Sequence, residues 1–102
     1  MPDSIPKGER KRILISELAT VGRARENDVC LPDPMVSRRH AILKVREVDE
    51  HSTLWLANLD ALNATFVNNI RIDKPREIHS GDRISIGGVS LTISSMRELK
   101  PR

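Results

Sequence analysis

Short apolar runs rich in Ile, Val, Leu and Thr, most of them alternating with period two, recur along this sequence. They cover residues 12–15, 29–31, 40–45, 53–56, 65–67, 70–72, 83–86 and 89–93. Breaks of Pro, Gly, Asp, Asn or Ser separate many of these runs, and no stretch of about 11 residues or more carries a helical stripe. Many short strands with closely spaced turns predict an all-β sandwich or barrel.

Two turns can be predicted from glycine. Gly87-Gly88 separates two alternating runs, and glycine accepts positive φ at little cost, so this pair predicts a tight hairpin. Ser80-Gly81-Asp82 stands just before the first of these runs and predicts the turn that leads into the same hairpin.

The length of 102 residues fits a single domain. We expect a flexible tail over residues 1–9, the domain over residues 10–96, and a basic tail over residues 97–102. The sequence contains no apolar run long enough to span a bilayer and no signal-peptide pattern. The default expectation is therefore a cytoplasmic protein, or a nuclear one in a eukaryote. The single cysteine, Cys30, is expected to be a small buried side chain.

The net charge of +3 belongs mainly to the two ends of the chain. Residues 1–12 carry +2 and residues 97–102 carry +2, which leaves −1 for residues 13–96. The basic balance therefore does not mark a broad nucleic-acid-binding face. Trp55 and Phe66 are the only aromatic residues, too few for a platform on which bases stack. We expect both to lie in the core.

Polar and basic residues gather between residues 21 and 41, in segments predicted to be loops. Loops on a rigid β framework commonly carry binding residues. A phosphorylated side chain has about −1.5 to −2 charges and three acceptor oxygens. It needs guanidinium groups, hydroxyls and free backbone N–H groups. Arg23, Ser37, Arg38 and Arg39 supply such groups, although their spacing alone does not show that they converge.

The order of the motifs resembles the forkhead-associated (FHA) domain family. That family's pattern is Gly-Arg, Asn-Asp, Val-Ser-Arg-x-His-Ala, Asn-Gly-Thr-x-Val-Asn-Gly and Gly-Asp. The chain carries Gly22-Arg23, Asn27-Asp28, Val36 to Ala41, Asn63 to Asn69, and Gly81-Asp82. The resemblance implies a β-sandwich of two antiparallel sheets with recognition loops at one end, which bind phosphothreonine.

The resemblance also implies the roles of five residues at the site. Arg23 is expected to contact the phosphate, Ser37 to donate its hydroxyl to it, and Arg38 to add a further contact. Asn63 is expected to hydrogen-bond the peptide backbone beside the phosphothreonine. Leu62 stands where the family often has a hydroxyl that reaches the phosphate, so its contact would have to come from the backbone.

Three further residues are expected to be structural by the same resemblance: Gly22, His40 and Asn68. The chain departs from the family pattern at Ala64 and Asn69, which replace glycines. A left-handed conformation at Ala64 would cost about 1 kcal/mol, whereas asparagine tolerates that region.

We expect no enzyme, no cofactor and no metal site. His40 follows Ser37 by three residues, but a nucleophile needs a base within reach and an oxyanion hole, and the sequence offers no such hole. One cysteine cannot build a zinc site without partners.

The favoured function is a phosphothreonine-dependent interaction module in signalling. Its partner would be a protein phosphorylated on threonine by a Ser/Thr kinase, and the domain itself would be a monomer without small-molecule substrate or membrane contact. Two alternatives stay open. One is an FHA-type scaffold or dimerisation module that binds independently of phosphate, suggested by Ala61, Leu62 and Ala64. The other is weak, salt-dependent nucleic-acid binding through the basic tails.

Overall fold

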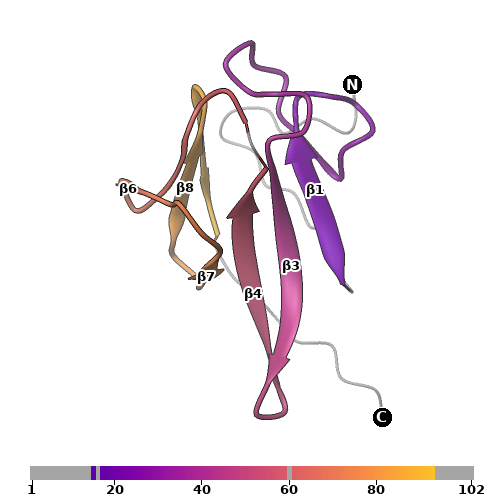
Figure 1. The fold of residues 1–102 in the computed structure, drawn as a ribbon, viewed down its shortest axis with the longest axis vertical. Helices are drawn as coiled ribbons and strands as arrows, with labels where there is room; N and C mark the ends of the chain where they lie inside the picture. Colours follow the sequence, from indigo (N-terminus) through magenta and orange to yellow (C-terminus); the bar gives the residue numbers. More distant parts are fainter. Residues whose placement is uncertain (1–14, 16, 60, 94–102) are drawn as a thin grey trace.

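The computed structural model describes residues 15, 17–59 and 61–93, and the described part forms nine strands and no helix (Figure 1). The strands are β1 Leu18–Gly22, β2 Val29–Cys30, β3 Ala41–Val48, β4 His51–Asn58, β5 Thr65–Val67, β6 Ile70–Arg71, β7 Arg76–Ile78, β8 Arg83–Ile86 and β9 Val89–Thr92. Accordingly, none of these residues belongs to a helix that could cross a membrane. The predicted tails, residues 1–9 and 97–102, lie outside the described residues.

Two sheets make up the fold. The first has five strands in the order β2-β1-β3-β4-β7, and the second has four in the order β6-β5-β8-β9. All neighbouring strands pair antiparallel except β1 and β2, which pair parallel. The chain passes from β4 into the second sheet for β5 and β6, then returns to the first sheet for β7. The all-β sandwich predicted from the sequence is confirmed, with this one parallel pair as an exception to its antiparallel sheets.

The strand predictions hold best where large apolar side chains alternate. The predicted runs 65–67 and 83–86 are β5 and β8. The run 12–15 is not a strand at Ile15, and its other residues lie outside the described part. Two strands were not predicted: β1, whose inward residues are small, and β7, a charged edge strand. Their apolar pattern is too weak to show in the sequence.

The core lies between the two sheets. Its largest fully buried apolar side chains come from both, as with Leu56 in β4 and Ile84 and Ile86 in β8. Leu43 faces Leu56 across β3 and β4, so the inward face of the first sheet is a continuous apolar ladder. Cys30 is 4% exposed, which confirms its predicted burial.

The expectation that the two aromatic residues fill the core is wrong. Trp55 and Phe66 are each partly exposed. Phe66 lies between the buried Thr65 and Val67, and Trp55 is followed by the buried Leu56, so their side chains point outward. The guanidinium of Arg46 lies 5.0 Å from the centre of the Trp55 ring. The core is filled by Leu, Ile, Val and Ala instead.

Tight turns set the register of the hairpins. Gly87 and Gly88 link Ile86 to its partner Val89, as predicted, and φ of Gly87 is +58°. Gly81, two residues before β8, has φ of +91° in the predicted turn. Asn68 and Asn69 form the two-residue turn between β5 and β6 with φ of 52° and 69°, which is typical of a type I′ hairpin.

Three loops meet at one end of the sandwich. Strands β1 and β4 end there and β3 begins there, at the top of Figure 1. The loops are residues 23–28 after β1, 31–40 between β2 and β3, and 59–64 after β4, the last with residue 60 outside the described part. They carry the residues that the sequence marks for binding.

Candidate functional site

Gly22 lets two of the loops pack directly against each other. A Cβ atom placed on Gly22 would lie only 2.8 Å from the carbonyl carbon of Arg38 and 2.9 Å from Nδ2 of Asn27. Asn27 is buried, and its Nδ2 donates to the carbonyl oxygens of Ala24 over 2.8 Å and Arg38 over 2.7 Å. A residue with any side chain at position 22 would push these loops apart.

Arg23 is held at its base and open at its tip. Its backbone N–H donates to the carbonyl of Ser37 and its Nε donates to the carbonyl of Val36, each over 2.9 Å. Because Nε is anchored, the two terminal amino groups of an otherwise exposed guanidinium are left to face solvent. This arrangement suits the two-pronged binding of an anionic oxygen pair.

Ser37 connects Arg23 to the third loop. The backbone N–H of Leu62 donates to Oγ of Ser37 over 3.1 Å. A hydroxyl that accepts a hydrogen bond still has its own proton to donate. Ser37 can therefore offer a directed O–H to an acceptor lying beside the Arg23 guanidinium. The Leu62 side chain is 91% exposed and takes no part in this contact.

Asn63 ties the third loop to the second. Its Nδ2 donates to the carbonyl of Met35 over 2.8 Å. The amide retains a second N–H and an oxygen, which are the groups needed to bind an extended peptide backbone. Met35 also packs closely against the β8–β9 turn, because a Cβ atom on Gly87 would lie 2.6 Å from its carbonyl oxygen. The β8–β9 turn thus supports the recognition loop.

His40 is fully buried and forms hydrogen bonds with backbone groups of neighbouring residues. Its Nδ1 accepts from the backbone N–H of Ser37 over 3.1 Å, and the backbone N–H of His40 donates to the carbonyl of Val21 over 2.8 Å. Burial lowers the pKa of His40, and the backbone of Asn63 and Ala64 partly opposes this shift. At neutral pH the ring is therefore uncharged, and because Nδ1 is an acceptor we assign the ring proton to the buried Nε2.

Comparison with known proteins decides the family. The family model of the FHA domain matches residues 19–87, more than half of the chain. The chain belongs to the FHA domain family. The resemblance inferred from the motifs is confirmed.

Individual FHA-containing proteins are similar over most of this chain. The ABC transporter ATP-binding/permease protein Rv1747 of Mycobacterium tuberculosis is 34% identical over 74 residues, which are 72% of this chain and 8% of that protein. This chain therefore spans only a small part of that protein, as it does of the FHA domain-containing protein PS1 of Arabidopsis thaliana, of which it covers 5%.

Two solved FHA structures share the fold. One comes from a structural and functional analysis of phosphothreonine-dependent FHA domain interactions, with a TM-score of 0.75, 29% identity and 91% of each chain covered. The other is the FhaA FHA domain complexed with the intracellular domain of Rv3910, with a TM-score of 0.67 and 31% identity. That match covers 81% of this chain and 86% of the other.

The departures from the FHA pattern are accommodated by the backbone. Among the described residues with positive φ, non-glycine residues are Asp49, Glu50, Asn68 and Asn69. Ala64 is not one of them, so the conformational cost considered for it does not arise. Asn69 adopts the left-handed region that asparagine tolerates.

Asn68 fastens the β5–β6 turn to β8, at the end of the sandwich away from the recognition loops. Its Nδ2 donates to Oδ1 of Asp82 over 3.0 Å, and its Oδ1 accepts from the backbone N–H of Arg83 over 2.9 Å. The backbone N–H of His79 donates to Oδ2 of Asp82 over 2.7 Å. This bond, and after it the bond from Asn68, lowers the pKa of the Asp82 carboxyl.

Arg38 enters the site through its backbone. Its carbonyl accepts from Asn27, but within residues 17–59 and 61–93 no hydrogen bond or ion pair joins its side chain to Arg23 or Ser37. Both Arg38 and Arg39 are exposed, and they line a pocket of about 400 Å³ beside the loop after β1. The phosphate contact expected of Arg38 stays a prediction.

The structure brings together four of the predicted binding residues: Arg23, Ser37, Leu62 and Asn63. Sequence reasoning did not assign roles to Asn27, to the Met35 carbonyl or to its close packing against Gly87. Asn27 stands two residues before a buried strand, and a polar residue so placed could have signalled a buried cross-link. No group of His, Cys, Asp and Glu within the described residues could hold a metal ion.

Proposed function

We propose that this FHA domain binds a phosphothreonine in a partner protein and acts as a signalling adaptor. The observation that carries this proposal is the Arg23–Ser37–Leu62 arrangement. An anchored guanidinium and a hydroxyl oriented by a neighbouring N–H stand on adjoining loops. Together they supply the charge and donors that a phosphate requires.

The known proteins support the same function. One similar structure concerns phosphothreonine-dependent FHA domain interactions, and another shows an FHA domain complexed with an intracellular domain of a second protein. By this proposal Arg23 contacts the phosphate, Ser37 donates to it, and Arg38 adds a further cationic contact. Leu62 acts through its backbone N–H, and Asn63 bonds the peptide backbone.

The proposal includes no catalytic step, cofactor or metal. His40 uses Nδ1 to accept the backbone N–H of Ser37, so the ring is not positioned as a base for the Ser37 hydroxyl. We expect a monomer whose partner is phosphorylated by a Ser/Thr kinase. The cytoplasm, or the nucleus in a eukaryote, is the expected setting, and a buried free cysteine is typical of such reducing compartments.

Titration calorimetry against a degenerate phosphothreonine peptide library tests the proposal. Phosphoserine and unphosphorylated libraries of the same composition serve as matched controls. We expect binding in the phosphothreonine set alone. Equal binding of the unphosphorylated set would contradict phosphate recognition and favour a scaffold, for which the exposed Leu62 and Met35 side chains offer an apolar surface.

A further inference from the structure

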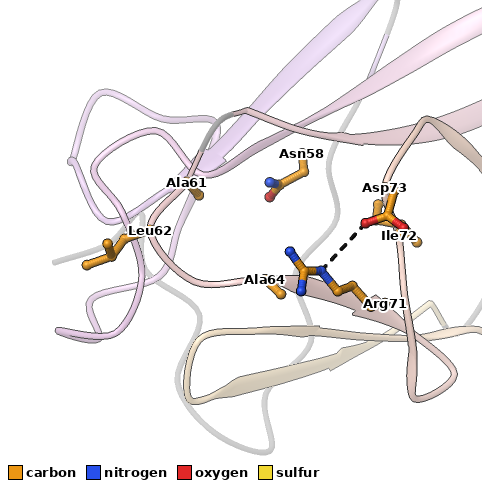
Figure 2. A pocket seen from close by; sticks show the side chains of 7 residues that line it. All are labelled: Asn58, Ala61, Leu62, Ala64, Arg71, Ile72 and Asp73. Carbon is orange, nitrogen blue, oxygen red and sulfur yellow. Dashed lines mark ion pairs between the residues drawn. The ribbon is translucent and has the colours of Figure 1, made fainter.

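A pocket of about 340 Å³ lies beside the phosphate-binding loops (Figure 2). The segment after β4 forms one wall, and the end of β6 forms the other. Leu62 belongs both to this pocket and to the candidate site, because its backbone N–H bonds Ser37. A ligand on Ser37 and Arg23 therefore has this pocket as an immediate neighbour.

Arg71 gives the pocket a cationic donor. Figure 2 shows its guanidinium directed across the hollow toward Asn58 and Ala61. Nε lies 3.6 Å from Oδ1 of Asp73, longer than a good hydrogen bond, and the two side chains are 68% and 83% exposed. Such an exposed ion pair contributes little to stability, and another anion can readily take the place of Asp73. The terminal amino groups of Arg71 are therefore available to another anion.

Asn58 supplies a second donor to the same pocket. Its Oδ1 accepts from Oγ1 of Thr65 over 2.8 Å, which fixes the amide orientation. Nδ2 takes no part in that bond, and Asn58 lines the pocket together with Arg71 (Figure 2). Arg71 and Asn58 thus bring N–H donors to the pocket from two different strands, and among the described residues that line it Asp73 is the one acidic side chain.

We propose that this pocket binds an acidic group of the same phosphorylated ligand, either a carboxylate or a second phosphate. The inference rests on the proposed function and adds a specificity determinant to it. An extended peptide advances about 3.3 Å per residue, so an acidic side chain a few residues from the phosphothreonine reaches the pocket. The incoming anion replaces Asp73 as the partner of Arg71.

The test measures how much an acidic residue improves affinity. A phosphothreonine peptide with neutral flanks is compared by calorimetry with peptides carrying one Glu, moved residue by residue along the flanks. The same positions are then tested with phosphoserine, which separates a preference for carboxylate from one for a second phosphate. For the wild-type domain we expect about a three- to tenfold gain at one position or two adjacent ones.

Three variants assign that gain to the pocket. Arg71→Gln should bring the affinity ratio of the acidic to the neutral peptide down to about one. Asp73→Asn should enlarge that ratio, because the carboxylate that competes for Arg71 is gone. Arg83→Gln removes the same charge at the opposite end of the sandwich, so it controls for long-range electrostatics and should keep the ratio. The ratio compares two peptides on the same variant, so a change that weakens the binding of both peptides equally does not alter it.

Distinct outcomes separate this inference from the proposed function. Binding of the neutral phosphothreonine peptide without an acidic gain at any position would overturn the pocket and leave phosphothreonine recognition standing. A gain that survives in Arg71→Gln would overturn it as well. Failure of every phosphothreonine peptide to bind would overturn the proposed function, and the pocket's role would fall with it.

Discussion

The backbone N–H of Leu62 donates to the hydroxyl oxygen of Ser37, which joins the loop after β4 to the loop before β3. The bond orients the Ser37 hydroxyl proton away from Leu62. A ligand phosphate would thus meet a donor that is already directed. The following predictions concern this pair and the residues that hold it.

Replacing Ser37 with Ala should weaken phosphopeptide binding by about 1–3 kcal/mol, because a donor to the phosphate is lost and the Leu62 N–H loses its acceptor. Calorimetry with a phosphothreonine peptide measures the effect. Ser80→Ala is the control, since Ser80 is an exposed residue in the turn before β8, away from the recognition loops. Equal losses in the two variants would contradict a specific role for Ser37.

Replacing Arg23 with Ala should cost about 2–5 kcal/mol of phosphopeptide binding, by analogy with the removal of one partner from a buried charge pair. Arg23→Lys should fall between the wild type and Arg23→Ala. Lysine keeps the charge but loses both the fork and the Nε bond to the Val36 carbonyl. Arg25→Ala, at an exposed position in the same loop, controls for net charge. Unchanged affinity in Arg23→Ala would refute the role given to this residue.

Replacing Gly22 with Ala should lower the free energy of unfolding by about 1–3 kcal/mol and weaken ligand binding, because the new Cβ overlaps the Arg38 backbone. Gly81→Ala is a matched comparison. A Cβ there meets nothing within 4 Å, but φ is +91°, so the cost is strain of about 1–2 kcal/mol. Urea unfolding should register both variants, whereas only Gly22→Ala should impair peptide binding.

Stability should fall as the pH drops below 6.5. Burial lowers the pKa of His40 from its ordinary value of 6.5. Below that value the unfolded chain takes up the proton first, so the loss grows as pH falls toward the folded-state pKa and then levels off. Above 6.5 the effect is absent. Urea unfolding at a series of pH values should show this slope.

Two variants isolate the His40 contribution. His40→Asn keeps an acceptor for the Ser37 N–H but cannot titrate, so it should lose the slope despite a lower overall stability. His51→Asn, at an exposed position, should retain it. An identical slope in wild type and His40→Asn would show that another group governs the acid response.

The sequence specifies this fold well where side chains are large and turns are marked by glycine. Strands β5 and β8 and the Gly87-Gly88 hairpin were predictable from alternation and backbone freedom alone. Strand β1 was not, because its inward face consists of the small residues Ala19 and Val21, whose burial is a property of the folded sandwich. The outward position of Trp55 was missed because aromatic size was taken as a sign of core packing.

The candidate site shows a similar division. Arg23, Ser37 and Asn63 could be named from the motif order, since their side chains carry the chemistry. Contacts made by backbone atoms, such as the Met35 carbonyl with Asn63, leave no mark in residue type. The pocket at Arg71 also escaped prediction, because it depends on how β6 lies against the loop after β4.

Asn63 and the β8–β9 turn both contact the backbone of Met35, while the side chains of Met35 and Leu62 are 53% and 91% exposed. A loop fixed in this way loses little conformational entropy when a ligand arrives. Because the loop is held through its backbone, the fold does not depend on the side chains of Met35 and Leu62. Mutation can exchange them at small cost to folding, so new ligand preferences can evolve here while the phosphate-binding frame stays the same.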